Sequence, residues 1–104
     1  MAKPKIDLPR EQLADFCRRW GIRELALFGS VLRDDFRQDS DLDVLVTFAS
    51  GTDWSLLDHV RMEQELAGML GHPIDLVSKR AVEQSHNWLR RREILNSAEV
   101  VYGS

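Results

Sequence analysis

A Gly-Ser pair ends the first apolar stretch of this chain, and two aspartates open the next stretch ten residues later. Residues 22–28 predict a strand with an apolar centre that Gly29-Ser30 ends, and residues 41–48 predict a second strand rich in Val and Leu. Because so few residues join them, the two strands are expected to pair antiparallel. Gly29-Ser30 and Asp41 would then lie at one edge of the same sheet.

The segments around these strands predict helices and a third strand. Residues 9–20 and residues 54–70 each carry apolar side chains at helical spacing, and a glycine follows each segment. The second helix leads the chain back to the starting edge, so residues 73–77 are expected to form a strand parallel to residues 41–48. Asp75 would then lie beside Asp41 and Asp43.

The remaining elements complete a mixed α/β (α+β) fold. A short helical turn is expected over residues 31–33, a helix over 82–95 and an edge strand over 99–102. We expect a small mixed β-sheet flanked by helices, in one domain that spans residues 1–104. The side chains expected to be buried on the helices over 54–70 and 82–95 are Leu56, Leu57, Val60, Leu66, Met69, Leu70, Trp88, Leu89, Ile94 and Leu95.

Composition excludes several classes of protein. The chain has 104 residues and a net charge of −3, which gives no reason to expect a dedicated nucleic-acid surface. Its apolar runs are too short to cross a membrane, and the first ten residues do not resemble a signal peptide. The single Cys17 excludes an intramolecular disulfide and indicates a cytoplasmic setting.

The paired aspartates predict a cation site. Asp41 and Asp43 are two apart on a strand, so they share a face, with Cα atoms roughly 6.6 Å apart. Two carboxylates on one face repel each other, and a hard cation such as Mg²⁺ would offset that repulsion. Two such ions could hold the attacking and leaving oxygens of a phosphoryl or nucleotidyl transfer. Asp75 could complete a metal shell or take a proton from an incoming hydroxyl.

Gly29-Ser30 could supply a cradle for a triphosphate. A strand that turns into a helix exposes backbone N–H groups to a phosphate, and Arg33 could reach the same phosphate from the following turn. Each feature alone also has a structural interpretation, because Gly-Ser is an ordinary turn and Arg33 could pair with a neighbouring Asp. An EF-hand loop is excluded, because Val44 and Ser50 occupy positions that require Gly and Glu.

The residues Leu27-Phe28-Gly29-Ser30, followed after ten residues by Asp41-Leu42-Asp43, resemble the signature of the polymerase-beta-like nucleotidyltransferase superfamily. The chain looks most like its small members, the minimal nucleotidyltransferase (MNT) domains, and residues 71–77 are similar to their third-carboxylate strand. This resemblance implies that Gly29 and Ser30 hold the triphosphate of ATP. It also implies that Asp41 and Asp43 bind Mg²⁺ and that Asp75 is the third acidic residue.

The resemblance also implies a partner. MNT proteins typically act as antitoxins of HEPN-domain ribonuclease toxins, and the implied reaction transfers AMP from ATP to a tyrosine of the toxin. Two alternatives stay open at this point. The chain could neutralise the toxin by stoichiometric binding, or it could transfer nucleotides to a small molecule or RNA.

Other residues could contact a partner. Lys79 and Arg80, together with residues 90–92, make the C-terminal part locally basic, which indicates either a solvated helix face or a docking patch. Trp54 is the tryptophan best placed for a protein contact. The three histidines are too scattered in the sequence to form a metal cluster.

Overall fold

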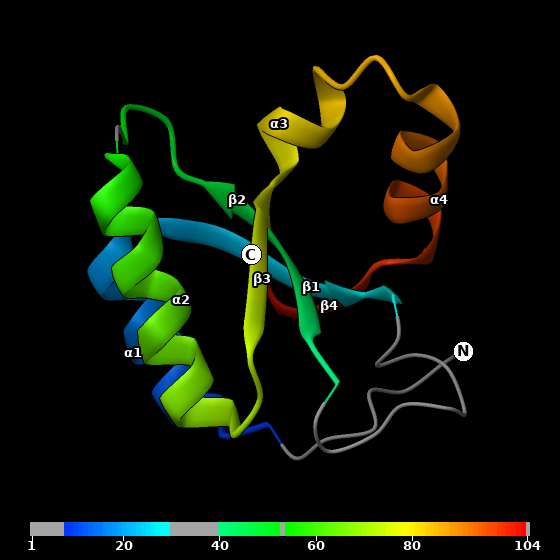
Figure 1. The fold of residues 1–104 in the computed structure, drawn as a ribbon. Helices are drawn as coiled ribbons and strands as arrows, with labels where there is room; N and C mark the ends of the chain where they lie inside the picture. Colours follow the sequence, from blue (N-terminus) through cyan, green and yellow to red (C-terminus); the bar gives the residue numbers. More distant parts are fainter. Residues whose placement is uncertain (1–7, 30–39, 53, 104) are drawn as a thin grey trace.

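A computed structural model describes residues 8–29, 40–52 and 54–103 of the chain (Figure 1). The turn expected over residues 31–33 lies outside this part of the chain. The elements in chain order are α1 (Arg10–Trp20), β1 (Ile22–Phe28), β2 (Leu42–Phe48), α2 (Leu56–Leu70), β3 (Ile74–Ser78), α3 (Lys79–Glu83), α4 (Trp88–Ser97) and β4 (Glu99–Gly103).

The strands form one mixed sheet in the order β3-β2-β1-β4. β1 pairs antiparallel with both β2 and β4, whereas β2 and β3 run parallel. Helix α2 makes the crossover between the two parallel strands, as the sequence predicted (Figure 1). The expected mixed α/β fold, with a small mixed sheet flanked by helices, is therefore confirmed.

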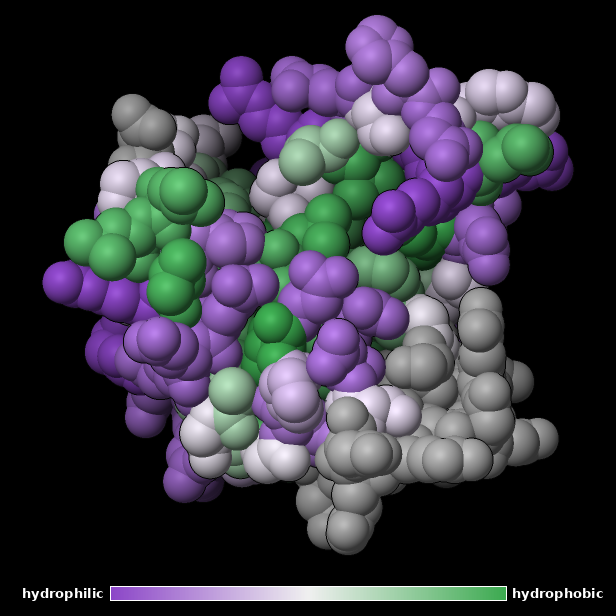
Figure 2. Space-filling model, viewed as in Figure 1, coloured by the Kyte–Doolittle hydropathy of each residue, from purple (hydrophilic) through white to green (hydrophobic). Residues whose placement is uncertain are grey.

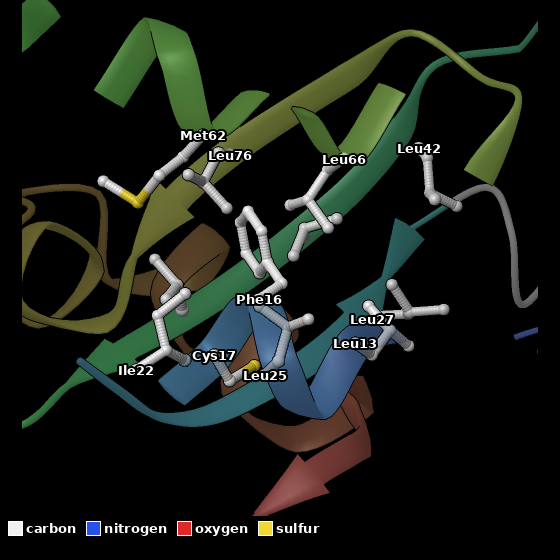
Figure 3. Close-up of a cluster of buried hydrophobic side chains, with 12 residues drawn as sticks. Leu13, Phe16, Cys17, Ile22, Leu25, Leu27, Leu42, Met62, Leu66 and Leu76 are labelled. Atoms are coloured by element: carbon white, nitrogen blue, oxygen red, sulfur yellow. The ribbon is translucent and has the colours of Figure 1, made fainter. Parts of the chain in front are cut away.

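Helices α1 and α2 cover one face of the sheet and form the larger core (Figures 1 and 3). Leu13, Phe16 and Cys17 recur at helical spacing on α1, so they share the side that packs on the sheet. Met62 and Leu66 of α2 meet them, and all five side chains are almost fully buried. This core fixes β1 and β2, whose ends carry the candidate site.

The other face of the sheet carries a smaller core, to which α3 and α4 contribute one buried side chain each. These are Val82 and Ile94, which pack with Ala26, Phe28 and Leu45 of the sheet. On β2, Leu45 and Asp43 are two residues apart, so both side chains lie on this second face.

The single helix expected over residues 82–95 is wrong, because the chain forms α3 and α4 with a break between them. Ser78 caps α3, since its hydroxyl accepts from the backbone N–H of Ala81. Asn87 caps α4 in the same way and accepts from the N–H of Arg90. A side chain that accepts from the N–H three residues on favours a new helix start over a continuous helix.

The predicted burial of the helices is also only partly right. Met69 and Leu70 are partly buried against the larger core, as expected, and Leu66 and Ile94 are fully inside. The expectation fails for side chains that are exposed instead, namely Leu56, Leu57, Val60, Trp88, Leu89 and Leu95. On α2 the exposed side chains lie in the first turns of the helix, directly after the capping box of Ser55 and Asp58.

Burial of Cys17 makes the fold less stable at alkaline pH. Burial raises the pKa of the Cys17 thiol from an ordinary value near 9 to about 12. The unfolded chain therefore loses this proton first, and the stabilisation falls as pH rises from about 9 to about 12. Over that window the free energy of unfolding should fall by up to ~1.4 kcal/mol per pH unit from this group.

Urea unfolding at several alkaline pH values measures this effect, and a Cys17→Ala variant is the matched control. The variant starts from a lower stability because it leaves a cavity, yet its slope against pH should be shallower than that of the wild type. Identical slopes would contradict the assignment to Cys17.

Within the described residues, no helix has both the length and the apolar composition needed to cross a membrane.

Candidate active site

Two of the predicted acidic residues lie side by side where β2 and β3 begin. Asp43 of β2 and Asp75 of β3 are direct partners in the parallel register. On its other side Asp43 is paired with Phe28, the last residue of β1. Asp43 is half-buried and Asp75 is exposed, so the pair is anchored in the sheet and open to solvent.

Gly29 makes room for the Asp43 carboxylate. Its φ of 75° lies in the left-handed region, where β1 turns away from the sheet. A Cβ atom on Gly29 would overlap Oδ2 of Asp43 and lie 3.2 Å from its Cγ. A side chain at this position would therefore shift the carboxylate and strain the left-handed backbone, so glycine is favoured at the end of β1.

Two contacts hold the start of β3 against the segment that precedes β2. The backbone N–H of Leu42 donates to the carbonyl of Pro73 over 2.8 Å. Nδ1 of His72 lies 3.4 Å from the carbonyl oxygen of Ser40, which accepts its proton. These contacts set the register that places Asp75 opposite Asp43. His72 therefore helps to position the site, although no histidine was predicted to belong to it.

Two side chains of α2 hold the edge strand next to Asp75. The Glu63 carboxylate accepts from the backbone N–H of Leu76 over 2.9 Å, and Nε2 of His59 donates to the Leu76 carbonyl over 2.8 Å. His59 and Glu63 are also 3.9 Å apart, one helical turn along α2. Their spacing of four residues puts both on one side of the helix, which is the sequence signal that could have identified them.

A Glu63→Ala variant tests this support for β3. We expect a loss of about 1–2 kcal/mol in the free energy of unfolding, because the N–H of Leu76 loses its acceptor. Urea unfolding measures the loss. The neighbouring Gln64→Ala replacement, at an exposed position of the same helix, should change stability by less than about 0.5 kcal/mol. Equal effects of the two variants would contradict the role of Glu63.

The third predicted carboxylate lies just outside the sheet. Asp41 is exposed and precedes β2, whose first residue is Leu42. Across residues 8–29, 40–52 and 54–103, no three His, Cys, Asp or Glu side chains form a group that could hold a metal ion. The register of the two strands pairs Asp43 with Asp75, whereas Asp41 lies one residue before β2. Ser30 and Arg33, expected to bind the triphosphate, lie outside the described residues.

The arrangement of Asp43 and Asp75 suits a cation with oxygen ligands. Carboxylate oxygens are the donors that Mg²⁺ prefers, and two carboxylates on adjacent strands repel each other unless a cation lies close to them. The space left by Gly29 keeps the Asp43 carboxylate at the strand end. An exposed Asp75 can also reach a group on a second molecule. Such a site can bind a metal-associated phosphate and accept a proton.

Solved structures of nucleotidyltransferases share this fold. One, assigned provisionally as a minimal nucleotidyltransferase, is 42% identical, with a TM-score of 0.64, and the match covers 86% of this chain and 85% of that one. Another contains a tri-AMPylated HEPN toxin of Shewanella oneidensis in complex with an MNT antitoxin. It is 18% identical with a TM-score of 0.61, and the match covers 91% of this chain and 70% of that one. At that identity the likeness shows the fold alone.

The family model described as the nucleotidyltransferase domain matches residues 9–101, so this chain belongs to that family. Among curated relatives, the protein adenylyltransferase MntA of Thermococcus cleftensis is 40% identical over 65 residues. That match covers 62% of this chain and 64% of the relative, a little under two thirds of the relative's length.

Proposed function

We propose that this chain is a magnesium-dependent nucleotidyltransferase that transfers AMP from ATP to a tyrosine of a HEPN ribonuclease toxin and thereby acts as its antitoxin. The observation that carries the proposal is the pairing of Asp43 with Asp75 beside Gly29. Membership of the nucleotidyltransferase domain family supports the reaction type. The adenylyltransferase relative and the AMPylated toxin in the Shewanella complex support AMP as the transferred group and a toxin as the acceptor.

In this proposal the three acidic residues share the metal ions, and one of them has a second role. Asp41, Asp43 and Asp75 would hold Mg²⁺, two ions in all, and Asp75 would also take a proton. Bound Mg²⁺ would neutralise charge on the triphosphate oxygens during the transfer. Asp41 and Asp75 are both exposed, so they can approach a bound substrate, whereas half-buried Asp43 is the fixed member of the set.

The backbone at the end of β1 would bind the triphosphate. Gly29 has no side chain to block the approach of a phosphate, and Ser30 and Arg33 would add a hydroxyl and a guanidinium. The tyrosine hydroxyl oxygen of the acceptor then attacks the α-phosphorus of ATP. Pyrophosphate leaves, and the hydroxyl proton passes to Asp75. The acceptor oxygen must therefore come within hydrogen-bond reach of Asp75.

We also propose that residues 1–104 act as one nucleotidyltransferase domain in a cytoplasmic setting, with the acceptor on another molecule. An acceptor in a separate protein requires a docking surface on this chain besides the acidic pair.

Incubation with ATP labelled at the α-phosphate tests the proposed function. A HEPN-domain ribonuclease toxin is supplied as the acceptor, and Mg²⁺ is present or replaced by EDTA. We expect label on a toxin tyrosine only with Mg²⁺, together with loss of the toxin's ribonuclease activity. Loss of ribonuclease activity without label would instead support stoichiometric binding. Label on RNA or a small molecule, with none on the toxin, would overturn the proposed acceptor.

A further inference from the structure

Helix α4 is poorly covered by the rest of the chain. Of its ten residues only Ile94 is buried, while Trp88 and Leu89 are 57% and 62% exposed. Leu95 is 37% exposed on the same helix. Large apolar side chains that gather on a short surface helix often mark an interaction site. The exposed apolar surface of α4 is therefore available to a second molecule.

The same region carries a local positive charge. Residues 79–95 hold five Lys and Arg against two Glu, although the whole chain has a net charge of −3. Arg90 and Arg92 are exposed next to the apolar side chains of α4. Figure 2 shows strongly hydrophilic and apolar side chains side by side over this helix. A surface of this kind complements carboxylates that surround an apolar group.

A cavity of about 210 Å³ lies between α3 and α4. Aliphatic side chains of Val77, Val82 and Ile94 line it together with Arg90 and Arg91. The Arg91 guanidinium is held in place, because it donates to the backbone carbonyl of Glu83 over 3.1 Å. An apolar pocket beside one held guanidinium suits an apolar side chain of a protein partner, which would be an anchor of the interface.

The position of this surface relates it to the acidic pair. Val82 and Ile94 pack on Phe28 and Leu45, on the face of the sheet that also carries Asp43. A molecule bound to α4 therefore lies on the same face as the proposed active site.

We propose that the surface formed by α3 and α4 docks the acceptor protein, through an acidic patch on that protein with an apolar side chain at its centre. This inference rests on the proposed function and adds the surface that presents the acceptor to Asp75. The apolar cavity and the exposed Trp and Leu side chains favour a protein over RNA, as does the negative net charge of the chain.

Two matched pairs of variants test the docking surface. Leu89→Ser on α4 is compared with Leu57→Ser on α2, because both side chains are 62% exposed. Arg92→Glu on α4 is compared with Arg61→Glu on α2, both at exposed positions. The affinity of each variant for the HEPN-domain acceptor is measured by calorimetry, and circular dichroism confirms that each variant is folded.

We expect each α4 variant to raise the dissociation constant at least about tenfold. Each α2 variant should change it less than about twofold. If both sets of variants lose the same affinity for the acceptor, or only the α2 variants lose affinity, the docking surface is overturned. Label transfer by the wild type would still leave the proposed function intact. A wild type that neither binds nor labels the acceptor overturns both. Single-stranded RNA is titrated in parallel, and α4 variants that lose RNA binding but keep the acceptor would also overturn the proposal.

Discussion

An Asp43→Asn variant should lose at least about a thousandfold in the rate of AMP transfer. Asparagine has nearly the shape of aspartate but carries no charge, so it removes the half-buried carboxylate that pairs with Asp75. A thousandfold loss corresponds to about 4 kcal/mol, within the several kcal/mol that a metal site contributes to charge stabilisation. The measurement is the initial rate of label transfer to the toxin.

The fold of this variant should be intact, because asparagine keeps nearly the shape of the aspartate side chain. We expect a thermal midpoint close to that of the wild type. An Asp15→Asn replacement on the exposed side of α1 is the matched control and should leave the rate unchanged. A folded Asp43→Asn protein that transfers AMP at the normal rate would contradict the assignment of the site.

A Gly29→Ala variant should reduce transfer at least about a hundredfold. The added Cβ would overlap Oδ2 of Asp43, so either the carboxylate or the end of β1 must move. A displacement of about 1 Å in a reacting group can cost about a hundredfold in rate. Alanine at the positive φ of this position should also cost about 1–2 kcal/mol of stability, which thermal unfolding measures separately.

Gly51→Ala is the control that separates backbone strain from the overlap with Asp43. Gly51 has a φ of 87°, yet a Cβ there would meet nothing within 4 Å. This variant should show a comparable loss of stability with transfer close to normal. If both glycine variants lose activity to the same degree, strain rather than displacement of the carboxylate is the cause.

Much of the strand arrangement could be predicted from chain direction. The connection between residues 28 and 42 is short enough to favour neighbouring antiparallel strands, and a crossover through α2 favours a parallel third strand. These rules place Asp75 next to Asp43 without any knowledge of side-chain packing. Glycine after a strand was likewise a sufficient signal for the turn at Gly29.

The burial of the C-terminal helices could not be predicted in the same way. Trp88, Leu89 and Leu95 are apolar, and the sequence does not say whether the sheet or another molecule covers them. The break between α3 and α4 depends on the cap formed by Asn87, a signal that local sequence does contain. The predicted burial of the apolar side chains at the start of α2 was wrong for a similar reason, because helical spacing does not reveal which part of a helix the sheet covers.

In the acidic site, too, only part of the arrangement could be predicted from the sequence. Strand register fixes the pair of Asp43 and Asp75, because both residues lie inside hydrogen-bonded strands. Asp41 precedes the first residue of β2, so the spacing of two on a strand, from which a shared face was predicted, does not extend to it.

The most direct test of the account is a calorimetric titration of the protein with a non-hydrolysable ATP analogue, with and without Mg²⁺. The wild type should bind the analogue at least about tenfold more tightly with Mg²⁺, and Asp43→Asn should lose that difference. Binding that is independent of Mg²⁺ in the wild type, or equally dependent on it in the variant, would contradict the claim that this carboxylate pair holds the metal-bound nucleotide.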